Sequence, residues 1–130
     1  MSFSIRSLLS VQQLNLEAVE RIFFVAEQMK NHFHKTGRFV PQASRENHVL
    51  ALLFLEPSTR TRMSFEMAAL RLGLHLIHME SPGGSSLEKG ETFLDTVATV
   101  ASMSPSAIVL RSPNEKELEA YLHGLKIPVI

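Results

Sequence analysis

A group of polar side chains stands where the chain changes from an apolar run to a helical pattern. Ser58-Thr-Arg-Thr-Arg62 follows the apolar run 48–55 and combines three hydroxyls with two guanidiniums. The first turn of a helix leaves backbone N–H donors without intrahelical partners and carries the positive end of the helix dipole. These groups together predict a cradle for a phosphate group. The alternative is an ordinary helix cap flanked by surface arginines.

The two arginines of this segment are expected to have different roles. Arg60 and Arg62 are two positions apart, so they point to nearly opposite sides of a helix and cannot both face one ligand. Arg60 lies nearer the helix start and is assigned to the ligand. Arg62 is expected to make a structural ion pair.

Two further segments could add donors for the same anion. The Gly- and Ser-rich segment 81–86 predicts a loop able to close over a ligand, with Ser86 and the nearby Lys89 as donors. Arg111 ends the predicted strand that begins at residue 107. The alternatives are a plain surface loop and a strand-end arginine that pairs only with a carboxylate.

The composition excludes several other kinds of site. The chain has no cysteine, which excludes disulfides, thiolate metal sites and cysteine nucleophiles. The histidines predict no metal pair, because His32 and His34 diverge on a helix while His75 and His78 point to opposite faces of a strand. Thirteen basic and thirteen acidic side chains balance, so no general attraction to nucleic acid or to a membrane surface is expected.

Neither a membrane span nor a secretion signal is predicted. No run approaches the roughly 18 apolar residues that a spanning helix needs. Residues 1–10 contain no apolar stretch followed by a small-residue cleavage site. The chain is therefore expected to be cytoplasmic.

Hydrophobic periodicity predicts an α/β domain. A helix capped by Asn15 comes first and is expected to fray around residues 32–34, and residues 35–47 form a connector. Strands and helices then alternate, which indicates a parallel sheet with helices on both faces. Ser58 and Thr59 are expected to cap the first of these later helices with their hydroxyls. The predicted strands are 48–55, 74–79, 107–110 and 127–130, and the predicted helices between them are 58–69, 91–103 and 113–124.

In such a sheet, ligands bind beyond the carboxyl ends of the strands. Those ends are expected within residues 56–62, 80–89 and 111–114. The three segments with anion-binding side chains are thus predicted to share one edge of the sheet.

Three segments resemble a known enzyme family. Phe54-Leu-Glu-Pro-Ser-Thr-Arg-Thr-Arg-Met-Ser-Phe-Glu66 resembles the carbamoyl-phosphate signature of the aspartate and ornithine carbamoyltransferases. Ser85-Ser-Leu-Glu-Lys-Gly-Glu-Thr92 resembles a loop of the aspartate branch, which the Glu-Pro before Ser58 also favours. Ile108-Val-Leu-Arg-Ser-Pro113 is similar to a third family segment that normally ends Arg-His-Pro, from which Ser112 departs. The resemblance extends from Leu8 to Ile130.

The resemblance implies a reaction and a set of site residues. In the family's aspartate branch, a carbamoyl group passes from carbamoyl phosphate to the amine of L-aspartate, at the entry to pyrimidine biosynthesis, with no cofactor and no metal ion. The implied ligands of carbamoyl phosphate are Ser58, Thr59, Arg60, Thr61 and Arg111. The implied catalytic residues are Arg60, Thr61, Lys89 and Arg111.

The resemblance also implies partners. The family's loop reaches into the site of a neighbouring subunit, so Ser86 and Lys89 are expected to contact phosphate and aspartate across the boundary within a homotrimer. Regulatory subunits, or other subunits of the pyrimidine pathway, are further candidate partners.

By the same resemblance, residues 1–130 correspond to the carbamoyl-phosphate-binding domain, cut short at its last strands, without the aspartate-binding domain. This chain alone is expected to be inactive in transfer. A non-catalytic anion-binding half-protein and a transcarbamoylase with another amine acceptor stay open as alternatives.

Overall fold

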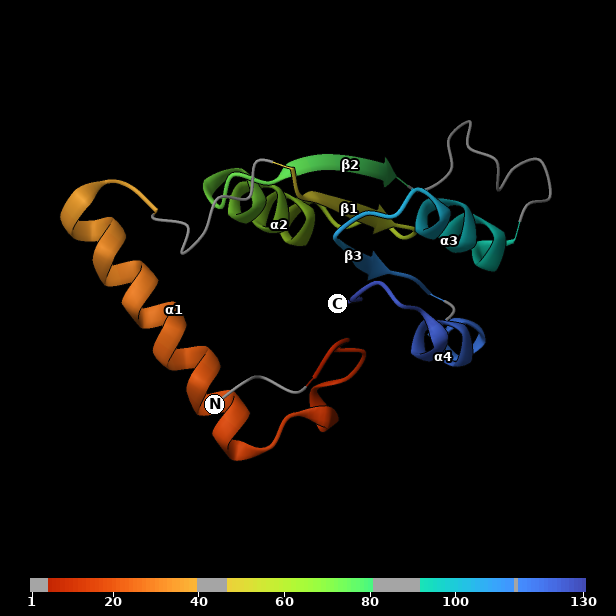
Figure 1. Cartoon of the computed structure of the whole chain (residues 1–130), viewed down its shortest axis with the longest axis horizontal. Coiled ribbons are helices and arrows are strands. Elements are labelled where there is room, and N and C mark those ends of the chain that lie inside the picture. Colours follow the sequence, from red (N-terminus) through yellow and green to blue (C-terminus); the bar gives the residue numbers. More distant parts are fainter. Residues whose placement is uncertain (1–4, 40–46, 81–91, 114) are drawn as a thin grey trace.

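The structure is a computed structural model, and it describes residues 5–39, 47–80, 92–113 and 115–130. From residue 49 onward, strands and helices alternate along the described chain, as the sequence predicts (Figure 1). The elements in chain order are η1 (Val11–Gln13), α1 (Leu16–Thr36), β1 (Val49–Phe54), α2 (Thr59–Arg71), β2 (His75–Glu80), α3 (Phe93–Ser102), β3 (Ala107–Arg111) and α4 (Glu115–Gly124).

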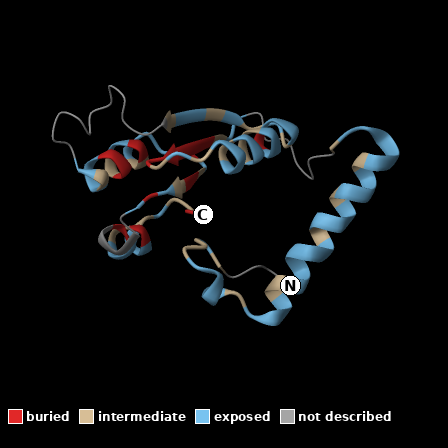
Figure 2. Cartoon of the chain, turned by 180° about the vertical axis from the view of Figure 1, so that it is seen from behind, coloured by how far each residue is buried: buried red, intermediate tan, exposed pale blue. Residues whose placement is uncertain are grey.

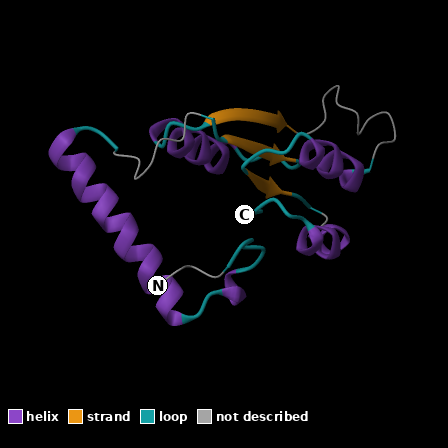
Figure 3. Ribbon diagram, viewed as in Figure 1, coloured by secondary structure: helices purple, strands orange, loops and turns teal. Residues whose placement is uncertain are grey.

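The described strands form one parallel sheet in the order β2-β1-β3 (Figure 3). β1 is central, and its last residue Phe54 is in register with Glu80 of β2 and Arg111 of β3. The end of the chain continues the sheet beside β3 through one parallel bridge, Ile108↔Val129. The predicted parallel α/β fold is confirmed, and the predicted fourth strand, 127–130, is reduced in the described chain to this bridge.

The two faces of β1 are buried under different helices. Leu53 packs with Val97 of α3 and Leu118 of α4, whereas Leu52 packs with Ala69 of α2 on the opposite face. Successive side chains of a strand alternate between faces, so a strand covered on both sides must be apolar throughout. This explains the continuous apolar run in the sequence, and it confirms helices on both faces of the sheet.

Helix α1 is built from local signals and lies apart from the sheet (Figure 1). Asn15 caps it as predicted, since its Oδ1 accepts a hydrogen bond from the N–H of Ala18 at 2.9 Å. The expected fraying around residues 32–34 was wrong: the helix continues to Thr36 and ends because Gly37 takes a left-handed conformation with φ 67°. Among the described residues, no helix is both long and apolar enough to cross a membrane.

The segment before α1 is tied to the last residues of the chain. The N–H of Leu8 donates to the carbonyl of Val129 at 2.8 Å, and the N–H of Val129 donates to Oγ of Ser7 at 3.1 Å. The segment that leads into η1 therefore lies beside the strand-like end of the sheet.

Candidate functional site

The carboxyl ends of β1 and β3 meet at one edge of the sheet. The N–H of Leu55, just after β1, donates to the carbonyl of Arg111 at 2.8 Å. Parallel neighbouring strands end at the same edge, so residues far apart in sequence become neighbours there. Arg111 is thereby placed beside the segment that joins β1 to α2.

The guanidinium of Arg111 is held by two partners. Its Nε donates to Oε1 of Glu56 at 2.5 Å, and its Nη1 donates to Oγ of Ser58 at 3.2 Å. The side chains of Arg111 and Glu56 are 43% and 35% exposed, so a ligand can reach both from solvent. The expected closeness of Arg111 and the Ser58 segment is confirmed. Arg111 also pairs with a carboxylate, which was the alternative considered for it.

Glu56 is the member of this arrangement that sequence reasoning missed. It lies two residues after the end of β1, and from the sequence it was placed only within the expected strand end 56–62 and within a family signature. A usable signal was present: an acidic residue and a basic residue each follow a predicted buried strand. Their pairing depends on β1 and β3 being neighbours in the sheet, which the order β2-β1-β3 provides.

The predicted phosphate cradle forms the start of α2. Ser58 is the N-cap residue, and Thr59, Arg60 and Thr61 make up the exposed first turn. The expected hydroxyl cap was wrong for Ser58: within the described residues its side chain makes no capping hydrogen bond, and its Oγ instead accepts from Arg111. Since a capping hydroxyl would occupy a first-turn N–H, this arrangement favours binding of an external anion there.

The two arginines of the cradle separate as helix geometry predicts. Arg62 forms an ion pair with Glu66 one turn later, with 3.4 Å between Nε and Oε1. This confirms the structural ion pair expected for Arg62. Arg60 is exposed in the first turn of α2, and its carbonyl accepts a hydrogen bond from Oγ of Ser64 at 2.9 Å.

The loop residues Ser86 and Lys89 lie outside the described residues. They belong to the connection between β2, which ends at Glu80, and α3, which begins at Phe93. Because β2 is parallel to β1, this connection starts from the same edge of the sheet as Arg111. The contribution of both residues to the site stays a prediction.

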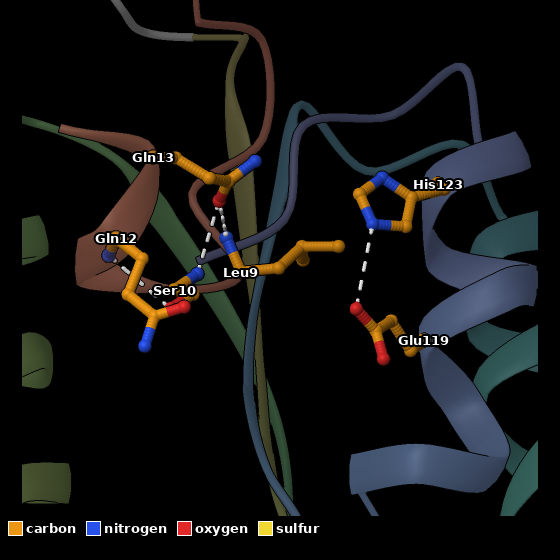
Figure 4. A network of polar contacts seen from close by, with 6 residues as sticks. All are labelled: Leu9, Ser10, Gln12, Gln13, Glu119 and His123. Atoms are coloured by element: carbon orange, nitrogen blue, oxygen red, sulfur yellow. Dashed lines mark hydrogen bonds and ion pairs between the residues drawn. The ribbon is translucent and has the colours of Figure 1, made fainter.

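A large open cavity of about 1040 Å³ adjoins Arg111. Its walls come from Glu56 and Arg111, from the segment around η1, and from α4. In Figure 4, Oε1 of Gln13 accepts from the N–H groups of Leu9 and Ser10, at 2.7 and 3.0 Å, and so orders the η1 wall. The opposite wall carries His123, whose Nε2 lies 3.9 Å from Oε1 of Glu119. The cavity offers space for a second polar reactant beside an anion at Arg111.

The start of α3 carries a carboxylate whose pKa is lowered. The hydroxyl of Thr92 donates to Oδ2 of Asp95 at 2.6 Å, and the N–H of Thr92 donates to the same oxygen at 3.1 Å. These bonds, the hydroxyl first, hold the pKa of Asp95 below its ordinary value. Thr92 and Asp95 form a capping box at the N-terminus of α3. The start of α2 differs, because in the described chain Ser58 makes no side-chain capping hydrogen bond there. No cluster of three or more metal-ligating side chains occurs within the described residues.

Comparison with protein families gives a match over almost the whole chain. The model of the aspartate/ornithine carbamoyltransferase carbamoyl-phosphate-binding domain matches residues 6–130. The chain is 38% identical over 125 residues to the aspartate carbamoyltransferase catalytic subunit of Thermococcus onnurineus, covering 96% of this chain. It is 43% identical over 123 residues to that of Haloquadratum walsbyi, covering 95% of this chain. The chain spans only 39% and 38% of the lengths of these two relatives.

Solved structures agree with the sequence relatives. The catalytic subunit of M. jannaschii aspartate transcarbamoylase superposes with a TM-score of 0.82 at 33% identity, over 97% of this chain and 41% of its own length. The enzyme from Trypanosoma cruzi, solved with carbamoyl phosphate and aspartate, superposes with a TM-score of 0.80 at 27% identity. That match covers 95% of this chain and 39% of the other. The similarity therefore extends over this α/β unit and leaves the larger part of each relative unmatched.

Proposed function

The chain belongs to the aspartate/ornithine carbamoyltransferase family, and we propose that it supplies the carbamoyl-phosphate site for carbamoyl transfer to the amine of L-aspartate. The observation that carries the proposal is the contact of Arg111 with Ser58 at the start of α2. It joins a cationic strand end to a helix N-terminus, and both favour a phosphorylated ligand.

The reaction needs positioning and charge stabilisation more than a nucleophilic side chain. The amine of aspartate attacks the carbonyl carbon of carbamoyl phosphate, and phosphate leaves from the resulting tetrahedral intermediate. In our proposal, Arg111 stabilises the developing charge on the carbonyl oxygen. The phosphate is held at the start of α2 by Ser58, Thr59, Arg60 and Thr61. Arg60 and Thr61 stay beside the phosphate as it takes up negative charge on departure.

The remaining parts of the site come from outside the described residues. We propose that Ser86 and Lys89 act in a neighbouring subunit's site within a homotrimer, with contacts to phosphate and aspartate. Regulatory or other pyrimidine-pathway subunits are proposed as further partners. Support for an aspartate-binding half beyond this domain is the length of the relatives, of which this chain spans 39%. A cytoplasmic location stays a prediction from the sequence.

Another amine acceptor is the main competing proposal. The family model covers both aspartate and ornithine enzymes. The named relatives and structures are aspartate enzymes, which supports aspartate as the acceptor. The other competitor is a non-catalytic anion-binding half-protein.

Calorimetry and a transfer assay test the proposal together. The 130-residue chain should bind carbamoyl phosphate or phosphonoacetate weakly, because the start of α2 and Arg111 are in place. It should form no carbamoyl-aspartate in a colorimetric assay, because the aspartate site is assigned to the unmatched part of the relatives. Absence of measurable binding would contradict the proposed site. Turnover by this chain at rates usual for enzymes would contradict the division of roles.

Substitution of the two arginines tests the cradle itself. A charge-assisted hydrogen bond contributes about 1.5–3 kcal/mol, so Arg60→Ala should weaken carbamoyl-phosphate binding on the order of tenfold to a hundredfold. Arg62→Ala is the matched control, since it removes the same charge two residues away but breaks the ion pair with Glu66. It should lower thermal stability slightly and leave binding nearly unchanged. Equal binding defects in two equally stable variants would refute the assignment.

A further inference from the structure

A second cavity, of about 460 Å³, lies between the carboxyl-terminal half of α1 and helix α2. Cavities that hold small molecules in proteins have volumes of about 300–1,000 Å³ and apolar walls with a few polar groups. Most of the wall here is apolar: α1 contributes Met29, and α2 contributes Met63 and Met67. Methionine side chains are flexible and polarisable, so such a wall adapts to apolar ligands of different shapes.

The charged side chain that lines this cavity is Arg71, the last residue of α2. Its guanidinium carbon lies 4.7 Å from the ring centroid of Phe33 and 5.0 Å from that of Phe39. The two rings also stack on each other, with 4.6 Å between their centroids. These contacts hold the guanidinium through the ring faces, and they leave its N–H donors available for hydrogen bonds.

Arg71 forms no ion pair within the described part of the chain, unlike Arg62 and Arg111. The segment 28–39, which supplies one methionine and both rings, contains two lysines, one arginine and no acidic residue. The charge of this segment is therefore positive, although the chain as a whole has no net charge. A small anion beside Arg71 thus gains charge-assisted hydrogen bonds in a favourable electrostatic surrounding.

We propose that this cavity binds an amphipathic monoanion, a small molecule with a carboxylate head and an apolar tail. The carboxylate accepts hydrogen bonds from Arg71, and the tail lies against Met63 and Met67. Both parts are needed, because an exposed charge pair is weak in water and the burial of the tail adds the remaining affinity.

This cavity is separate from the proposed carbamoyl-phosphate site. Arg60 and Arg71 are eleven residues apart on α2, which corresponds to roughly 17 Å along the helix axis. One end of the helix carries the phosphate cradle and the other end carries the guanidinium of the cavity. Binding in the cavity therefore does not depend on the proposed function.

Calorimetric titration of the 130-residue chain with octanoate tests the site. Octanol has an equally long tail without the charge, and acetate has the charge without the tail. Octanoate should bind at least about tenfold more tightly than either, because only it uses both the arginine and the methionines. Its affinity should be unchanged when carbamoyl phosphate is present.

Substitutions assign the contacts. Arg71→Gln removes the charge and should weaken octanoate binding by about tenfold while leaving octanol binding unchanged. Arg21→Gln is the matched control, because Arg21 also lies over a ring, 5.7 Å from the centroid of Phe24, but does not line the cavity. It should leave octanoate binding unchanged. Met67→Gln keeps a side chain of similar length and should weaken octanoate and octanol alike. If Arg71→Gln does not fold, the three ligands and Met67→Gln still decide.

Binding that needs both the tail and the charge, and that Arg71→Gln weakens, supports the proposal. Equal affinities for octanoate and octanol overturn it, as do equal losses in Arg71→Gln and Arg21→Gln or a lack of measurable octanoate binding. Competition between octanoate and carbamoyl phosphate also overturns it, because octanoate would then occupy the cradle. Analytical ultracentrifugation adds a last test. Self-association that Met67→Gln abolishes would show that a second copy of the chain covers the cavity, and the small-molecule site would be refuted.

Discussion

Strand β1 and helix α1 differ in how far their residues are buried (Figure 2). In β1, every residue from Leu50 to Phe54 is buried. In α1, none of the 21 described residues is buried, and Phe23 is 68% exposed. The strand exists because tertiary packing covers both of its faces, whereas the helix exists through its caps and its periodic sequence.

This difference indicates which part of the domain contributes most to its stability. Burial of apolar surface is the main favourable term in folding, so the sheet and the helices on its faces carry most of it. Near the carboxyl end of α1, the guanidinium of Arg71 in α2 lies 4.7 Å from the ring centroid of Phe33. The same guanidinium lies 5.0 Å from the ring of Phe39. The rest of α1 presents apolar side chains to solvent, which is typical of a surface that a partner covers.

The largest effect is expected from the centre of the sheet. Leu52→Ala removes a side chain with no exposed surface, and such substitutions cost about 2–5 kcal/mol because a cavity remains. Urea denaturation followed by circular dichroism should show a single transition at a much lower midpoint. A loss below about 1 kcal/mol would show that the core around β1 is not what stabilises the fold.

A smaller effect is expected from the helix caps, and it should differ between the two regions. Thr92 and Asn15 each accept a hydrogen bond from a first-turn N–H, at 3.1 Å in α3 and 2.9 Å in α1. Thr92→Ala should lower the global free energy of unfolding by about 1 kcal/mol, because α3 packs on the sheet. Asn15→Ala should mainly reduce the helicity of α1 and leave the global transition in place. Equal shifts of the global transition would refute the comparison.

The cap of α3 also predicts a pH dependence. The pKa of Asp95 is lowered in the folded state, chiefly by the Thr92 hydroxyl. Its stabilising contribution is therefore complete above the unfolded value of about 3.9 and is lost as the pH falls through the folded value. Thr92→Ala should lose less stability than the wild type on acidification below about pH 4. An identical acid dependence in both proteins would exclude this cap as its source.

The smallest effect is expected from the exposed face of α1. Phe23→Ser exchanges residues of similar helix propensity, so the free energy of unfolding should change by no more than about 0.5 kcal/mol. Chemical denaturation of the isolated chain measures this directly, with Leu52→Ala as the buried reference. A loss comparable to that of Leu52→Ala would show that α1 packs in the folded chain as firmly as β1.

Much of the site was predictable from local sequence, and the errors have identifiable causes. Helix geometry alone separated Arg60 from Arg62, and the ion pair of Arg62 is present. The expected Ser58 cap failed because a non-local partner, Arg111, engages its hydroxyl. The end of α1 was misplaced because Gly37, which can adopt a left-handed conformation, outweighs the polar residues before it.

The sequence by itself determined the type of the helices α1 to α4 and the strands β1 to β3, and it predicts an anionic ligand. An apolar run, hydroxyls and arginines at a helix start, and a left-handed glycine act over a few residues, so they can be recognised from local order. Only the tertiary structure decided which charges meet. β1 lies between β2 and β3, and this strand order brings Glu56 to Arg111 across 55 positions of sequence. Strand order depends on how the helices pack on both faces of the sheet, and that packing is a property of the whole fold.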